Sequence, residues 1–161
     1  MMAISSSVRT AWDRNLEVNR ALIHHLTAEM LAAQTPGGGY SVAQHLSHIV
    51  GVVKFWGTLL DPARLSALPD LPDPDSAILT EGPETDPTHI LEVLEATAEA
   101  ALAAAEARPQ GSDELPHADA DAYLIHMIAH DAHHRGQVLL ALKTSGHPLP
   151  DEEGLWSPWR S

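Results

Sequence analysis

Apolar residues recur at steps of three and four along most of the chain, which is the spacing of one face of an α-helix. Four segments carry this pattern, at about 6–34, 42–60, 87–107 and 119–144. No segment alternates apolar and polar residues between regularly spaced turns, as the strands of a sheet would. The pattern therefore predicts an all-α protein with four long helices and an irregular tail at 145–161.

Residues that favour helix ends flank these segments. Ser41 is an N-cap candidate for the second helix, and Asp86 followed by Pro87 suits the start of the third. The fourth helix is predicted to begin near Asp119 or two residues later, and Gly146 suits its end. Local signals thus agree with the apolar periodicity.

A stretch of about 25 residues separates the second helix from the third, and it is rich in proline. The sequence ALPDLPDPDSAILTEGPETDP, which leads into the third helix, carries Pro69, Pro72, Pro74, Pro83 and Pro87. Repeated prolines exclude long regular structure, and a connection of this length is unusual in a compact domain. In a helical bundle it can run the length of the molecule, so that the two helices it joins point the same way. We therefore expect one domain over 1–161, a four-helix bundle with a long crossover between helices 2 and 3.

The composition narrows the classes of function. Hydrophobic residues make up 44% of the 161 residues, which is typical of a globular chain. No apolar run approaches the ~20 residues that span a bilayer, and the start MMAISSSVRTAWDRN lacks the order of a secretory signal. The absence of cysteine excludes disulfides and thiolate ligands and suits a reducing compartment. We expect a cytoplasmic protein with no membrane partner.

The charge argues against nucleic acid as a partner. The formal net charge is -13, and between Asp70 and Asp121 there are 14 acidic residues against one basic residue, Arg108. A field of this sign repels a phosphate backbone. The acidic surface points to no particular partner, and solvation is its simplest explanation.

Histidines gather in the fourth helix, in the stretch HMIAHDAHHRGQ at 126–137. His126 and His130 are four residues apart, and so are His130 and His134, which places each pair on one helix face. Two imidazoles at this spacing can bind a single divalent ion. His130 and His134 align with apolar residues and are expected to face inward, whereas His126 and His133 lie on a neighbouring flank. A hydrogen-bonded structural role is the alternative for each of them.

A metal site also needs a third ligand from another segment. The second helix offers His45 and His48, in the stretch QHLSHIV. Helical spacing alone does not choose between these two residues.

Two stretches together resemble the DinB/YfiT-like superfamily: YSVAQHLSHIV, and HMIAHDAHHRGQVLLALKTSGHPLP. The histidine pair before HRGQ is the most specific part of the resemblance. Carried over by position, it implies a metal-binding triad of His48, His130 and His134, with His126 and His133 as neighbours of the site. It also implies a four-helix bundle whose crossover joins the second and third helices, in agreement with the prolines.

Three neutral imidazoles leave a divalent ion with open positions, and zinc and nickel both suit such ligands. The resemblance implies a metal-dependent transferase that activates a low-molecular-weight thiol, such as bacillithiol, mycothiol or glutathione, for attack on an electrophile. A non-catalytic, stress-associated metal-binding module is the first alternative. A metal-dependent hydrolase that uses bound water is the second. No catalytic side chain is assigned from the sequence.

The fourth helix also carries a second apolar strip, which faces away from the histidine pair. The strip consists of Ile125, Ile128, Ala132 and Leu139. One buried stripe is enough for a helix in a bundle, so the second must be covered by the crossover, by the tail with Trp156 and Trp159, or by another subunit. The resemblance implies a homodimer formed by bundle helices.

Arg135 and Gly136, which follow the histidine pair, are given structural roles. Arg135 is expected to tie the fourth helix to a carboxylate or to a helix end. Gly136 is expected to allow close packing of helices.

Overall fold

The computed structural model describes residues 4–76, 82–108 and 116–161, and every regular element in them is helical. The helices are α1 (Ser6–His24), α2 (Ala28–Leu31), α3 (Val42–Thr58), α4 (Pro62–Ser66), α5 (Pro87–Ala107), α6 (Ala120–Thr144) and the 3-10 helix η1 (Glu153–Arg160). The predicted all-α class is confirmed. None of the described helices combines the length and the apolarity needed to cross a bilayer.

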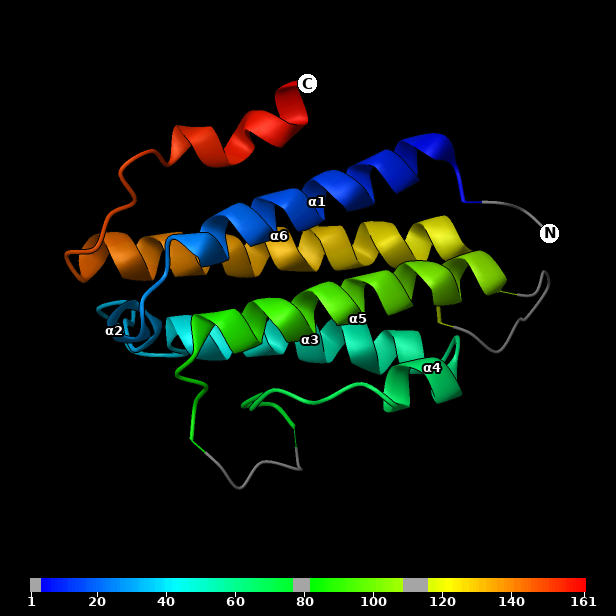
Figure 1. Cartoon of the computed structure of the whole chain (residues 1–161), viewed down its shortest axis with the longest axis horizontal. Coiled ribbons are helices and arrows are strands. Elements are labelled where there is room, and N and C mark those ends of the chain that lie inside the picture. The colour runs from blue at the N-terminus through cyan, green and yellow to red at the C-terminus, as the bar shows by residue number, and fades with distance from the viewer. Residues whose placement is uncertain (1–3, 77–81, 109–115) are drawn as a thin grey trace.

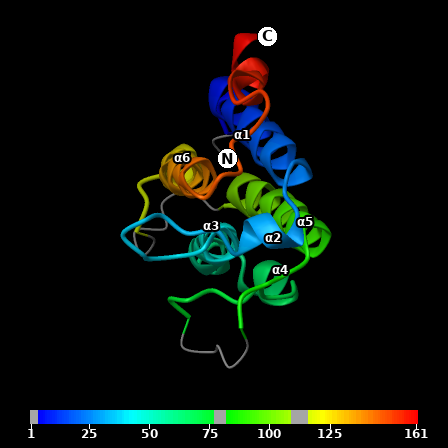
Figure 2. The ribbon, with the colours of Figure 1, turned by 90° about the vertical axis from the view of Figure 1, so that its left-hand side faces the viewer.

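The four long helices lie side by side along the long axis of the molecule (Figure 1). α3 packs against both α6 and α5, and α1 packs against the same two helices. In Figure 1, α1 and α6 run from right to left, whereas α3 and α5 run from left to right. The chain between α3 and α5 passes along the outside of the helices, on the side of α3 and α4 (Figure 2). This path returns the chain to the end of the molecule at which α3 begins.

The predicted helix ends are confirmed where capping residues mark them. The side chains of Ser41, Asp86 and Asp119 each accept a hydrogen bond from a backbone N–H in the first turn of their helix. Ser41 and Gln44 form a complete capping box. Gly146 has a φ of +82°, the left-handed conformation that ends a helix without the steric cost of a Cβ. Residues 77–81 of the connection and residues 109–115 after α5 lie outside the described residues.

The prediction of one helix over 6–34 is wrong, because α1 ends at His24 and the short helix α2 follows. Thr27 starts the new helix, and its hydroxyl accepts a hydrogen bond from the backbone of Met30. Leu26 and Leu31 are both buried, so the apolar spacing continues across the break. Periodicity alone therefore cannot detect a change in helix direction at this point.

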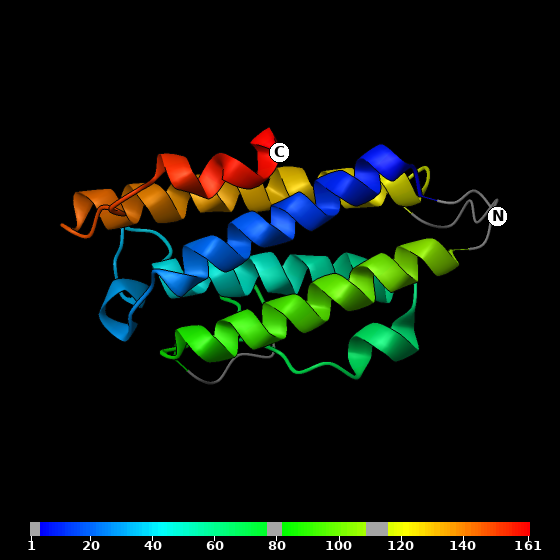
Figure 3. The ribbon, with the colours of Figure 1, turned by 45° about the horizontal axis from the view of Figure 1, so that its top comes forward.

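The prediction of an irregular tail is also wrong in part, since η1 occupies Glu153–Arg160. η1 packs against α1 and lies above it in Figure 1, whereas Figure 3, which brings this side of the molecule forward, shows η1 in front of part of α6. Leu155 is buried in the same core cluster as Leu139 of α6. The end of the second apolar strip of α6 thus lies in the core to which the tail contributes, while Ile125 at its start is 52% exposed.

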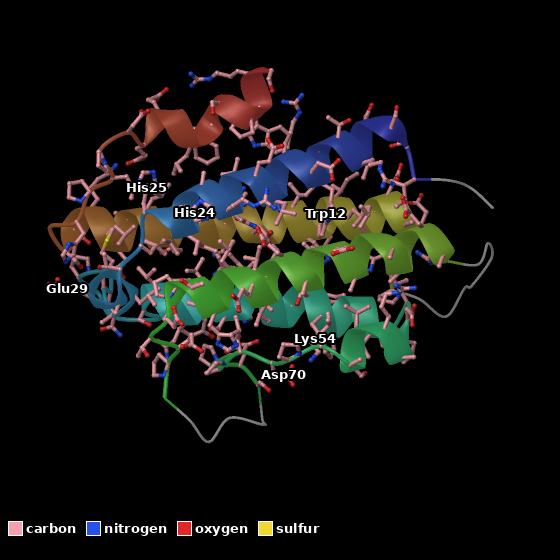
Figure 4. All side chains as sticks on the ribbon, viewed as in Figure 1. Trp12, His24, His25, Glu29, Lys54 and Asp70 are labelled. Atoms are coloured by element: carbon pink, nitrogen blue, oxygen red, sulfur yellow. The ribbon has the colours of Figure 1, made fainter. Side chains whose placement is uncertain are left out.

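The chain that follows α3 is tied back onto that helix. Lys54 Nζ donates hydrogen bonds to Asp70 Oδ1 at 2.6 Å and to the carbonyl of Leu68 at 2.7 Å (Figure 4). Leu65 and Leu71, on either side, are buried. These contacts hold the start of the connection beside α3.

Candidate metal centre

Three histidines converge from two helices that pack directly against each other. His48 lies in the second turn of α3, and His130 and His134 lie one turn apart near the middle of α6. One ring nitrogen from each histidine lies within 4.8 Å of those from the other two. The ring centroids are 5.1 Å apart for His48 and His130, 4.7 Å for His48 and His134, and 4.5 Å for the pair on α6. The structure thus brings together the three residues that the resemblance implies.

His48 is held by carboxylates from the connection after α3. Its Nδ1 lies 3.1 Å from Asp73 Oδ1 and 3.6 Å from Asp75 Oδ2. The hydrogen bond with Asp73 raises the pKa of His48 even though burial opposes it. Burial would raise the pKa of Asp73, but the hydrogen bonds with His48 and with the backbone of Asp75 outweigh it and lower that pKa. With Nδ1 occupied in this way, Nε2 is the nitrogen of His48 left for a ligand.

A glycine allows this carboxylate to approach α3. A Cβ at Gly51 would lie 2.2 Å from Asp73 Oδ2, closer than any real contact of this kind. Gly51 lies about one helical turn after His48, and a larger residue there would push Asp73 away from His48. The absence of a side chain is therefore part of how the site is built.

His134 has a second histidine behind it. Its Nδ1 lies 2.9 Å from Nδ1 of His45, so one of the two nitrogens carries the hydrogen and the other accepts it. His45 is buried and is not part of the converging group among the described residues. Of the two histidines that spacing offered, His48 belongs to the group with the pair on α6, and His45 lies beside His134.

His130 and His134 are kept neutral by their surroundings. Burial, reinforced by neighbouring histidines, lowers the pKa of His134 to about 3 and that of His130 to about 4. Burial also lowers the pKa of His45. A neutral imidazole is the form that binds a metal ion, so no proton has to be displaced at neutral pH.

The residues present fit a divalent ion. His130 Nδ1 is buried and has no hydrogen-bond partner within the described part of the chain. A buried polar atom of this kind normally requires a partner. Three neutral imidazole nitrogens are a donor set that suits zinc or nickel.

A family model described as the DinB family matches residues 5–161. The chain belongs to the DinB family. No curated protein and no solved structure gives a match. The resemblance inferred from the histidine motifs is thereby confirmed, and a metal site at the three histidines is consistent with membership of the family.

In this DinB protein, the carboxylates that hold His48 could not be identified from the sequence. Asp73 and Asp75 lie in the proline-rich connection, which has no periodicity to indicate where a side chain points. The contact of Tyr40 could not be identified from the sequence either. Its hydroxyl donates a hydrogen bond to Asp75, which raises the pKa of Tyr40 to about 12. The ring of Tyr40 lies 5.9 Å from that of His48 and so covers one side of the site.

The two remaining histidines of the motif lie outside the converging group. His126 Nδ1 is 2.9 Å from Nε2 of His117, in the segment before α6. His133 is exposed, with its ring 5.0 Å from that of His134. These positions agree with the expectation that both are neighbours of the site.

Proposed function

We propose that this DinB protein binds one divalent ion, zinc or nickel, through His48, His130 and His134, and that it is a metal-dependent transferase. Its cosubstrate is a low-molecular-weight thiol of the bacillithiol, mycothiol or glutathione type, which attacks an electrophile. The observation that carries the proposal is the convergence of three histidines within 4.8 Å at the contact between α3 and α6. We also assign the four long helices as the bundle of the family and residues 59–86 as its crossover.

A divalent ion held by three imidazoles keeps open positions and can bind a thiol as its thiolate, the more nucleophilic form. The roles of the chain follow from its contacts. Asp73 accepts the Nδ1 hydrogen of His48 and so fixes both the tautomer and the direction of that ring. The Nδ1 atoms of His134 and His45 share one hydrogen, and this bond orients the ring of His134 so that its Nε2 is left for the ion.

In the reaction, the sulfur forms a bond to carbon of the electrophile, and the bond from that carbon to the leaving group breaks with its electron pair on the leaving group. The proton of the thiol passes to water. Because the chain has no cysteine, the sulfur comes from the cosubstrate and no thiol of the protein competes for the ion.

A cavity beside His48 favours an enzyme over a binding module. It has a volume of about 520 Å³ and lies between α3 and the connection; His48, Val50 and Phe55 are among its lining residues, whereas His130 and His134 are not. This volume lies within the range of small-molecule sites, which are also mostly apolar. A module that only binds metal needs no such space.

The test is metal analysis followed by a screen of thiols. The purified protein is loaded with zinc or nickel and assayed with chlorodinitrobenzene as electrophile and each thiol in turn. We expect turnover only with metal and with one class of thiol, and loss of turnover in His130→Ala. His133→Ala, which removes an exposed histidine from the same helix, is the matched control. Bound metal without turnover would indicate the non-catalytic module, and turnover without thiol would indicate a hydrolase.

We further propose a cytoplasmic homodimer. The outward face of α6 supports the dimer, because Ile125 is 52% exposed and Leu140 is 46% exposed. A stable contact between helices of two copies would bury roughly 1,000 Å² or more. Light scattering at micromolar concentration is the test, and a mass near the 17.3 kDa of one chain would rule the dimer out.

A further inference from the structure

A buried polar network joins α1 to the helix that carries two of the three histidines. Asp131 Oδ2 accepts hydrogen bonds from the side-chain amides of Asn15, at 2.8 Å, and Asn19, at 3.0 Å. Arg135 Nη1 donates to the side-chain carbonyl oxygens of the same two asparagines, each at 2.7 Å. Each asparagine therefore bridges the carboxylate and the guanidinium.

The placement of this network in the sequence is directly related to the site. Asp131 and Arg135 each follow one of the converging histidines of α6, His130 and His134, by a single residue. One residue turns an α-helix by about 100°, so the histidines point toward α3 while the next residues point toward α1. Asn15 and Asn19 are also four residues apart, so they have the same one-turn spacing on α1 as Asp131 and Arg135 have on α6.

Packing alone does not explain these four residues. All are buried, with exposures of 2–3%. Apolar side chains of similar volume would fill the same space without the cost of removing a carboxyl group, a guanidinium and two amides from water. What the polar set adds is direction, because two amides that both bridge one carboxylate oxygen and one guanidinium nitrogen restrict the rotation and the register of α6 against α1.

The required accuracy shows why such a restraint matters. A ring nitrogen lies several ångströms from the axis of its helix, so a 10° rotation of α6 would move it by roughly 1 Å. Distances from ligand to metal tolerate only about 0.2 Å. A small rotation would therefore remove His130 and His134 from their common point with His48.

We propose that Asn15, Asn19, Asp131 and Arg135 form a positioning network that sets the rotation of α6 and thereby the geometry of the histidine ligands. The inference rests on the proposed metal site. It gives Arg135 a different role from the predicted tie to a carboxylate or helix end, because its partners are two amides of α1 that hold Asp131 as well.

The experiment uses the full chain loaded with Co²⁺, whose visible absorption reports the coordination geometry. Asn15→Leu and Asn19→Leu keep the volume and each remove one bridge. Arg135→Lys keeps the charge but shortens the side chain and loses Nη1, the atom that bonds to both asparagines, and it serves as the second variant if the asparagine variants do not fold. Tyr123→Phe is the matched control, since it deletes a buried hydrogen bond of α6 that points to the carbonyl of Val53, away from α1.

We expect each network variant to bind Co²⁺ 10- to 100-fold more weakly, as loss of supporting contacts around a metal site usually does, and to show an altered visible band. The control is expected to keep the band and the affinity while losing stability. Unchanged affinity and band in the folded network variants would overturn the positioning role alone, as would equal changes in the control. A wild-type chain that binds no Co²⁺ would overturn the proposed metal site and this inference with it.

Discussion

The two halves of the candidate site use the same residue type in opposite surroundings. On α6, His130 and His134 lie among buried residues, and burial lowers the pKa of both. On α3, His48 faces the carboxylates of Asp73 and Asp75, and its pKa is raised. Burial disfavours the charged imidazole, whereas a hydrogen-bonded carboxylate favours it. One half is thus a neutral pair on a restrained helix, and the other is a single ring made more basic by an anion.

The halves also differ in what holds them. The α6 half is set by secondary structure, since one turn of helix fixes the spacing of its two rings. The α3 half depends on an irregular segment that reaches His48 only because Gly51 leaves room for Asp73. We therefore expect substitutions in α6 ligands to remove the site, and substitutions around His48 to weaken it.

The largest expected effect is that of His130→Ala. It should lower metal affinity by more than the roughly 100-fold that loss of a supporting partner costs, because two imidazoles cannot replace three. Element analysis after dialysis checks this, with His133→Ala as the control on the same helix. Full metal content in His130→Ala would show that the three histidines are not the ligands.

The α6 half could be predicted from sequence because its geometry is local. Helical spacing alone places His130 and His134 one above the other and facing inward. The choice between His45 and His48 depends on how α3 is rotated against α6, which no local pattern contains. Asp73 comes from a segment without periodicity.

Asn19 falls on the apolar stripe of the first helix, and a polar residue in such a stripe was a signal that a buried polar contact lay there. Its partners, Asp131 and Arg135, lie more than a hundred residues away and could not be named from that signal. The break between α1 and α2 was hidden for a related reason, since the apolar residues on both sides of it are buried in the same core cluster. Long-range packing decided each of these features.

The second prediction concerns protonation of the metal-free protein. His48 is expected to take up its proton above pH 6.5, His130 near pH 4 and His134 near pH 3. Imidazole resonances followed by NMR during a pH titration measure each value. In Asp73→Asn the negative charge next to His48 is lost, so the pKa of His48 should fall. A common titration of all three rings near pH 6.5 would contradict the contrast between the halves.

The third prediction weakens the α3 half without touching a ligand. Gly51→Ala places a methyl group where Asp73 Oδ2 now lies, and Asp73→Asn removes the charge itself. Each should lower metal affinity by roughly 10- to 100-fold, because the acceptor that orients His48 is displaced or weakened. Competition with a coloured chelator measures the affinity. Wild-type affinity in both variants would show that His48 needs no carboxylate behind it.

The smallest effect is expected for Gly136→Ala on α6, and this variant is the control for Gly51→Ala. Gly136 is exposed on α6, and a Cβ there meets no described atom within 4 Å, so the predicted role in close packing finds no neighbour in the described part of the chain. Alanine loses less backbone entropy in a helix, so Gly136→Ala should stabilise the fold by about 0.5–1 kcal/mol and leave metal affinity unchanged. Guanidinium unfolding and chelator competition measure the two quantities. A loss of stability instead, accompanied by a smaller mass in light scattering, would mean that a second copy packs closely against this glycine.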